Sequence, residues 1–174
     1  MKFKIIALSV ALALSLPSLA WAKTLKFPKD DPQFTVTFAS DWKAEITDAG
    51  IISAQPKGTG YAISIFPVVS KNARDAIEET VKEVDKRFQS VKPSDPVEFK
   101  TANNIAFLER DFTAKDKGSA RALAIVAFSV DKKNFFALFQ AGTPEADKQY
   151  TQDVVAIVKS IKSLKASAED DDDD

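Results

Sequence analysis

The sequence predicts an α+β domain in which a single antiparallel sheet of about six to eight strands carries two main amphipathic helices. The first observation behind this fold class is a pair of apolar runs, 120–130 and 135–141, that flank the polar turn 131–134. The second and third are two segments with helical periodicity, within 72–91 and 143–164. Because both faces of the two runs are apolar, we expect them to form a β-hairpin at the centre of a covered sheet.

The composition excludes several classes of chemistry. The 174-residue chain contains neither cysteine nor histidine. Disulfides, thiol catalysis, Cys/His zinc sites, haem–histidine ligation and Ser–His or Cys–His relays are therefore excluded. The formal net charge is −1, but without the six acids of residues 169–174 the remaining 24 basic and 19 acidic residues give +5. No dense basic stripe is present, so we expect no nucleic-acid partner. We also expect no cofactor.

The first 22 residues have the pattern of a cleaved signal peptide. Lys2 and Lys4 form a positive n-region, and residues 5–16 form an apolar stretch. That stretch is too short to span a bilayer comfortably. Small residues before the predicted site indicate cleavage after Ala22, and an uncleaved membrane anchor is the alternative. We therefore expect a periplasmic or secreted protein with no stable membrane span after cleavage.

Alternating apolar residues predict the strands of the N-terminal half. After a loop over 27–32, we expect four strands that form an antiparallel meander with tight connections. These strands are expected over 34–38, 42–46, 51–55 and 61–65. Pro67 is expected to end the fourth strand. Trp42 follows a turn at Asp41 and is expected to fill the core.

An amphipathic helix is expected next. Asn72 is a suitable N-cap, with Asp75 three residues later, where an acid favours the helix dipole. The apolar face of the helix consists of residues spaced by three or four: Ala73, Ile77, Val81, Val84, Phe88 and Val91. Pro93 and Pro96 are expected to close this segment.

Two further strands, over 97–101 and 105–114, are expected before the central hairpin. The second contains Glu109, Arg110 and Asp111 within an otherwise apolar sequence. Alternation places Glu109 and Asp111 on one face and Arg110 on the other. Two carboxylates in an apolar cleft would be an acid/base pair for a hydrolase or lyase. Alternatively, the three residues form the rim of the sheet, with Arg110 paired to a neighbouring acid.

The last helix has the clearest start signals in the chain. Thr143 is expected to be its N-cap and Pro144 its first helical residue. Its apolar face is formed by Tyr150, Val154, Ile157, Ile161 and Leu164. We expect the folded domain to span residues 23–165 and residues 166–174 to form a disordered acidic tail.

The acidic tail offers one candidate for a metal site. Its aspartates are Asp170, Asp171, Asp172, Asp173 and Asp174. A run of this kind would bind Ca²⁺ or another hard cation weakly, because it lacks the fixed geometry of an EF-hand loop. The alternatives are a solubilising tail, a segment that docks on a basic surface, or part of a protease tag.

The order of elements resembles that of the PsbP-like and DcrB-like group of small exported proteins. The resemblance covers about residues 27–164 and rests on F-T-V-T-F at 34–38, the turn before Trp42, the amphipathic helix, the long strand–turn–strand block and V-K-S-I-K at 158–162. It implies an α/β/α sandwich that binds partners and is not catalytic. It also implies structural roles for Trp42 and Ser160. The metal-associated photosystem role of some members is not implied, because the chain has no histidine.

Four phenylalanines concentrate on the central hairpin: Phe128, Phe135, Phe136 and Phe139. We expect them to fill the space between helix and sheet, with the lining of a ligand pocket as the alternative. The leading hypothesis is a non-catalytic periplasmic or secreted protein that binds or supports a cell-envelope partner, either an unidentified envelope protein or a small ligand. The alternatives are a carboxylate-dependent enzyme using Glu109 and Asp111, and weak cation binding by the tail.

Overall fold

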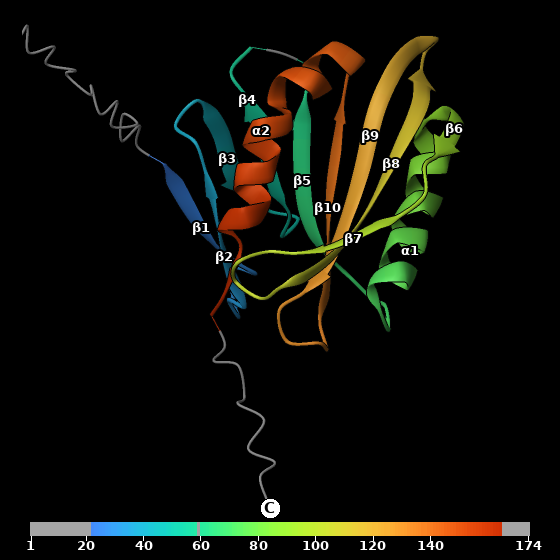
Figure 1. Ribbon diagram of the computed structural model, residues 1–174. Coiled ribbons are helices and arrows are strands. Elements are labelled where there is room, and N and C mark those ends of the chain that lie inside the picture. Colours follow the sequence, from blue (N-terminus) through green and yellow to red (C-terminus); the bar gives the residue numbers. More distant parts are fainter. Residues whose placement is uncertain (1–21, 59, 165–174) are drawn as a thin grey trace, which may run out of the picture.

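The computed structural model describes residues 22–58 and 60–164 of the chain (Figure 1). The predicted tail, 166–174, lies outside the described residues, as does the predicted signal peptide up to residue 21. Cleavage after Ala22 and disorder of the tail therefore stay predictions. Within the described part of the chain, no helix has the length and apolar character needed to cross a membrane.

The strands form two antiparallel sheets, so the predicted single sheet is wrong, although the α+β class is confirmed. The larger sheet has the order β3-β4-β5-β10-β9-β8-β6, and β7 also pairs with β8. Its strands are β3 (Trp42–Ile46), β4 (Ile52–Pro56), β5 (Ala62–Val68), β6 (Gln89–Pro93), β7 (Val97–Lys100), β8 (Ala106–Asp116), β9 (Ser119–Ser129) and β10 (Phe135–Gly142). The smaller sheet consists of β1 (Lys23–Phe27), β2 (Phe34–Phe38) and β11 (Lys162–Ser163).

Strand β2 is the element whose partners differ from the prediction. It pairs with β1, which precedes it, and with β11 near the end of the domain. It does not continue into the meander that β3, β4 and β5 form. The pairing of β2 with β11 joins residues that lie 127 and 129 positions apart in the sequence, Lys162 with Thr35 and Ser163 with Phe34. Local alternation carries no information on such a partner. Strand β5 also continues past its predicted end, because Pro67 pairs with Phe136.

The central hairpin of β9 and β10 is confirmed. The two strands occupy the middle of the larger sheet, and Phe128 lies opposite Phe136. Asp131 organises the turn, because its carboxylate accepts hydrogen bonds from the backbone N–H groups of Lys133 (2.9 Å) and Asn134 (2.8 Å). The turn therefore satisfies backbone donors that the strands leave unpaired.

Helix α1 (Ala73–Arg87) begins as predicted and ends earlier than predicted. The side chain of Asn72 caps it by accepting a hydrogen bond from the N–H of Asp75 at 2.9 Å. Phe88 takes an extended conformation, and the chain then enters β6, so the predicted helical position of Val91 is wrong. The apolar spacing continues through this junction because Val91 is half-buried from the strand.

Helix α2 (Pro144–Ser160) also begins at the predicted cap. The hydroxyl of Thr143 accepts a hydrogen bond from the N–H of Ala146 at 3.2 Å. Ile161 ends the helix and is fully buried, whereas Leu164 lies beyond the helix and is 43% exposed. The prediction that Leu164 belongs to the apolar helix face is therefore wrong.

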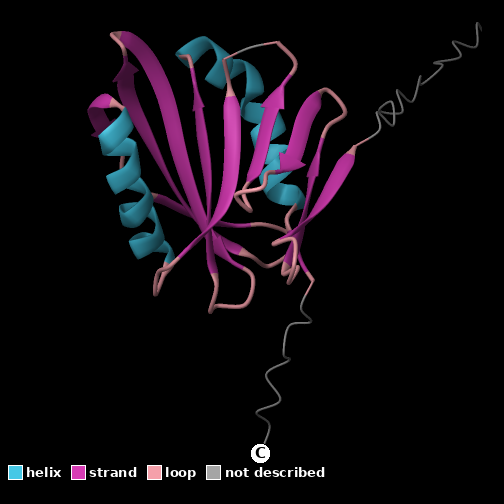
Figure 2. Cartoon of the chain, turned by 180° about the vertical axis from the view of Figure 1, so that it is seen from behind, coloured by secondary structure: helices cyan, strands magenta, loops and turns pink. Residues whose placement is uncertain are grey.

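The two helices cover opposite faces of the larger sheet, which gives an α/β/α arrangement with the smaller sheet beside α2 (Figures 1 and 2). Alternation along β9 shows this directly. Val126 and Phe128 belong to the core that contains the α2 residues, and Ile125 and Ala127 belong to the core that contains the α1 residues. Both faces of β9 are therefore buried, as its continuous apolar sequence requires.

Candidate functional site

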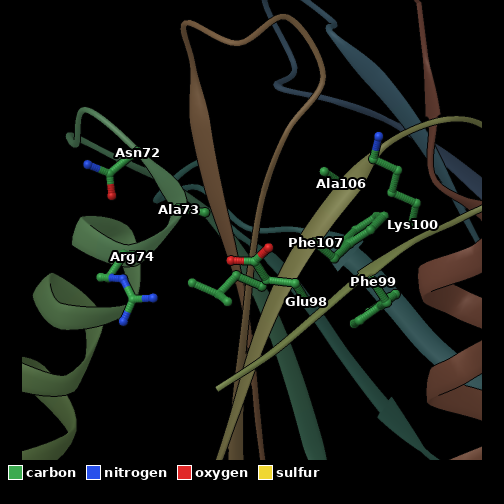
Figure 3. A pocket seen from close by; sticks show the side chains of 9 residues that line it. Asn72, Ala73, Arg74, Glu98, Phe99, Lys100, Ala106 and Phe107 are labelled. Carbon is green, nitrogen blue, oxygen red and sulfur yellow. The ribbon is translucent and has the colours of Figure 1, made fainter. Parts of the chain in front are cut away.

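A pocket of about 480 Å³ lies between the start of α1 and the β7–β8 pair, and we call it the α1–β7 pocket. It is lined by Asn72, Ala73, Arg74, Glu98, Phe99, Lys100, Ala106, Phe107 and Leu108. Figure 3 shows the helical residues on one side and the strand residues on the other. Three separate segments of the chain therefore build one site.

Strand register determines which side chains face α1. Glu98 lies opposite Leu108, and Lys100 lies opposite Ala106, so these four residues share one face. Leu108 belongs to the core on the α1 side, which identifies that face as the one toward the helix. The floor of the pocket is therefore apolar at Leu108 and Ala106, with charged groups beside it.

A stacked aromatic pair supports the same strands from the opposite side. The rings of Phe99 and Phe107 lie 5.3 Å apart and are nearly parallel, at 8°. Phe107 belongs to the core on the α2 side and is 2% exposed. Figure 3 shows both rings on the side of the strands away from α1. This packing holds the strand wall of the pocket in place.

The turn between β7 and β8 is tied to the end of α2. The side-chain amide of Asn103 donates hydrogen bonds to the carbonyl oxygens of Lys159 (3.1 Å) and Ile161 (2.8 Å). Asn104 has a φ of 58°, a left-handed conformation that asparagine tolerates better than most residues. The strand wall is thus anchored at its turn as well as through its aromatic pair.

Charged groups of both signs line the pocket. Arg74 lies on the helix wall, and Glu98 and Lys100 lie on the strand wall. Arg74 and Glu98 form no ion pair with each other within the described residues. Asn72 is committed to the cap, because its side chain also donates to the Asp75 carboxylate at 2.9 Å. The positive end of the α1 dipole lies on the same wall as Arg74.

A second, smaller pocket of about 230 Å³ lies near the other end of α1. Two arginines line it, Arg87 and Arg121. Arg121 already contacts the Asp116 carboxylate at 3.3 Å, and the Arg87 guanidinium lies over the Phe88 ring at 5.4 Å. These contacts give both cations a structural role.

The predicted carboxylate pair lies on the α2 side of the sheet. Burial raises the pKa of Glu109, and the charges of Asp111 and Asp147 add to the rise. Burial also raises the pKa of Asp111, and it raises that of Asp147, with Asp111 contributing. Neither of the two pockets described above is lined by Glu109 or Asp111. The structure thus gathers acidic groups here without placing the predicted pair in either pocket.

Arg110 lies on the opposite face and contacts α1. Its Nη1 lies 3.6 Å from a carboxylate oxygen of Glu78, and its Nε donates to the carbonyl oxygen of Ser94 at 3.0 Å. These contacts connect β8 with the helix and with the segment after β6. They agree with the rim arrangement, in which Arg110 has an acidic neighbour.

The residues predicted to be structural lie in the two cores or at their edges. Trp42, Phe128 and Phe136 are buried on the α2 side, and the indole N–H of Trp42 donates to the Asp153 carboxylate at 3.3 Å. Phe135 and Phe139 are half-buried in the core on the α1 side.

Ser160 joins the end of α2 to the smaller sheet. Its hydroxyl accepts a hydrogen bond from the backbone N–H of Thr37 at 2.9 Å and donates to the carbonyl oxygen of Ile157 at 2.6 Å. The candidate metal ligands Asp170, Asp171, Asp172, Asp173 and Asp174 lie outside the described residues. Among residues 22–58 and 60–164, no group of three or more acids could hold a metal ion.

Solved structures with this fold share little sequence with the chain. LpqN, involved in cell envelope biogenesis of Mycobacterium tuberculosis, has a TM-score of 0.57 at 12% identity, over 82% of this chain and 91% of its own. Cyanobacterial PsbP (CyanoP) from Synechocystis sp. PCC 6803 has a TM-score of 0.58 at 8% identity, over 90% of this chain and 98% of its own. PA94, a protein of unknown function from Pseudomonas aeruginosa, has a TM-score of 0.50 at 12% identity, over 72% of this chain and 88% of its own. No protein-family model and no curated protein matches the chain.

These comparisons confirm the PsbP-like resemblance at the level of the fold. Identities of 8–12% transfer neither residue roles nor activities to this chain. The sequence did not point to the α1–β7 pocket, because Arg74, Glu98 and Lys100 read as ordinary exposed charges. The alternation V-E-F-K over 97–100 is the one local signal, since it turns two charges toward the same face.

Proposed function

We propose that the protein is a non-catalytic, periplasmic or secreted binding protein of the cell envelope, and that the α1–β7 pocket is its ligand site. The observation that carries the proposal is the pocket itself. Its volume of about 480 Å³ falls within the range typical of small-molecule sites. It also combines an apolar floor with a few charged groups, which is how such sites fix the orientation of a ligand.

The residues that line the pocket favour binding over catalysis. The residues that line it include Glu98 as the sole carboxylate, together with Arg74 and Lys100. An acid/base mechanism needs a proton donor and acceptor placed around one bound substrate. The groups with raised pKa values, Glu109 and Asp111, line neither pocket. A hydrolase or lyase that uses them stays the alternative, and turnover lost in Glu109→Gln and Asp111→Asn would establish it.

The assignment to the cell envelope rests on the predicted signal peptide and on the fold that the chain shares with LpqN. N-terminal sequencing of protein recovered from its native compartment tests this part of the proposal. We expect the mature chain to begin at Lys23. A protein that remains in the cytoplasm would contradict export, whereas an exported chain that keeps residues 1–22 would support the uncleaved membrane anchor.

The ligand site is tested with a neutral dye that fluoresces in apolar surroundings, N-phenyl-1-naphthylamine. Ala106 is exposed and lines the pocket, so Ala106→Phe should fill the pocket and remove most of the dye signal. Ala120→Phe is the matched control, because Ala120 is also an exposed alanine in a strand and lines neither pocket. Thermal unfolding verifies that both variants fold. Equal dye binding by the two variants would remove this pocket from consideration.

A further inference from the structure

The charges of the α1–β7 pocket are arranged across its apolar floor. Figure 3 shows Arg74 extending from α1 and Glu98 extending from β7 toward the helix. Leu108 lies opposite Glu98 in the register of β7 and β8. The pocket thus offers a cation on one wall and a carboxylate on the other. A ligand that spans the pocket would meet both groups.

The two charged groups are open to a ligand. Among the described residues, neither Arg74 nor Glu98 has a salt bridge, whereas four other ion pairs are formed, including one from Glu78 in the same helix. The acid that follows Arg74 in the sequence, Asp75, accepts a hydrogen bond from the amide of Asn72. The Asp75 carboxylate is therefore already engaged by the side chain of Asn72 at the helix cap. Lys100 adds a second cation farther along the strand wall.

Building on the proposed function, we propose that the α1–β7 pocket binds a small zwitterion with an apolar side group, the chemistry of an apolar amino acid or a short peptide with free ends. The ammonium group lies at Glu98 and the carboxylate group at Arg74. The apolar side group covers Leu108 and Ala106. A purely anionic ligand would leave Glu98 unmatched, and a purely cationic ligand would leave Arg74 unmatched. An unmatched charge that loses water opposes binding.

The ligand test uses four forms of one dipeptide, each titrated by calorimetry into the chain that begins at Lys23. They are leucyl-leucine, its N-acetyl form, its C-terminal amide and the form blocked at both ends. We expect leucyl-leucine to bind most tightly, and each block to weaken binding about two- to fivefold, the range for one partly exposed charge pair. Free leucine in the same series distinguishes an amino acid from a peptide as the preferred size.

Two substitutions assign the ends of the ligand to the walls of the pocket. In Glu98→Gln, acetylation of the amino end should no longer weaken binding, while amidation of the carboxyl end still does. In Arg74→Gln the pattern should reverse. The matched controls are Glu45→Gln in edge strand β3 and Arg87→Gln at the other end of α1, which should keep the wild-type pattern. A merely structural role of Glu98 or Arg74 would weaken all four forms alike.

The outcomes separate this inference from the proposed function. Equal binding by all four dipeptides, or tighter binding of a form with a single charge, would overturn the zwitterion assignment while the pocket remained a ligand site. The same holds if the two substitutions fail to exchange the pattern. Absence of binding by every form, together with loss of the dye signal difference between Ala106→Phe and Ala120→Phe, would overturn both.

Discussion

Replacing Gly142 by alanine should destabilise the protein because the ring of Tyr61 occupies the space of the added methyl group. A Cβ built at Gly142 would lie 2.3 Å from Cδ2 of Tyr61 and 3.1 Å from Cε2. Real Cβ atoms essentially never approach closer than 3.0 Å, so the ring has to move by the better part of an ångström. Tyr61 is 1% exposed, and its ring packs against Trp42 and Tyr150 at centroid distances of 6.2 and 5.4 Å.

The expected cost follows from two effects. Overpacking of a well-packed core costs about 1–3 kcal/mol. Displacement of the ring also breaks the hydrogen bond that the Tyr61 hydroxyl donates to Oε1 of Gln140 at 2.7 Å, which contributes about 1 kcal/mol. We therefore expect Gly142→Ala to lower the free energy of unfolding by about 2–4 kcal/mol. With a urea m-value of about 2 kcal/mol/M, the middle of the usual range, the midpoint should fall by roughly 1–2 M.

Urea unfolding followed by tryptophan fluorescence measures this cost. Trp42 reports on the cluster directly, because Trp21 lies in the predicted signal peptide and is absent from a chain that begins at Lys23. The control is the same substitution in a Tyr61→Leu background, where a flexible side chain replaces the ring. There, Gly142→Ala should cost little, since alanine is favoured over glycine in a strand by about 0.5–1 kcal/mol. A neutral effect in the wild type, or the same cost in both backgrounds, would refute this reasoning.

Three further predictions concern single side chains, each measured by urea unfolding. Burial is the main cause that raises the pKa of Glu109 above its ordinary value of 4.5, so the protonated form of Glu109 stabilises the fold below pH 4.5 and this stabilisation is lost as the pH rises through the folded-state pKa. Glu109→Gln should therefore increase the stability of the protein at pH 7 and make stability depend less on pH. Reduced stability of this variant at pH 7 would contradict the prediction. Burial acts to raise the pKa of Asp131, but hydrogen bonds from Asn134, Lys133 and Ser129 lower it to about 2, so stability should fall as the pH drops from 3.8 toward 2. Asp131→Ala should abolish this acid-dependent loss and destabilise the hairpin at pH 7, with Asp131→Asn milder, and an unchanged acid response would contradict this. Ser160→Ala should cost about 1 kcal/mol because the N–H of Thr37 loses its acceptor, and a cost below about 0.3 kcal/mol would indicate that water replaces the hydroxyl.

Local sequence signals were sufficient for the helices and the central hairpin. The caps at Asn72 and Thr143 are properties of a few adjacent residues, and the structure places both helix starts there. The runs that became β9 and β10 are apolar on both faces, which only a covered strand allows. The boundary of α1 was misjudged because apolar residues of the same spacing continue into β6.

Long-range pairing accounts for what the sequence did not show. The second sheet exists because β2 takes partners from both ends of the domain, β1 and β11. The candidate site has a similar origin, since segments 72–74, 98–100 and 106–108 become one pocket only after β7 pairs with β8 beside α1. The first two segments contain exposed charges and the third is the apolar sequence A-F-L, so none carries a recognisable motif.

The most direct test of the ligand site is a map of backbone amide shifts in the ¹⁵N-labelled chain that begins at Lys23, titrated with leucyl-leucine. The pocket assignment predicts that the amides of Arg74, Glu98 and Leu108, from three separate segments, shift together and follow one saturation curve. Saturable shifts confined to the surroundings of Arg121 would contradict the pocket assignment, and the absence of any saturable shift at these three amides would contradict the zwitterion assignment.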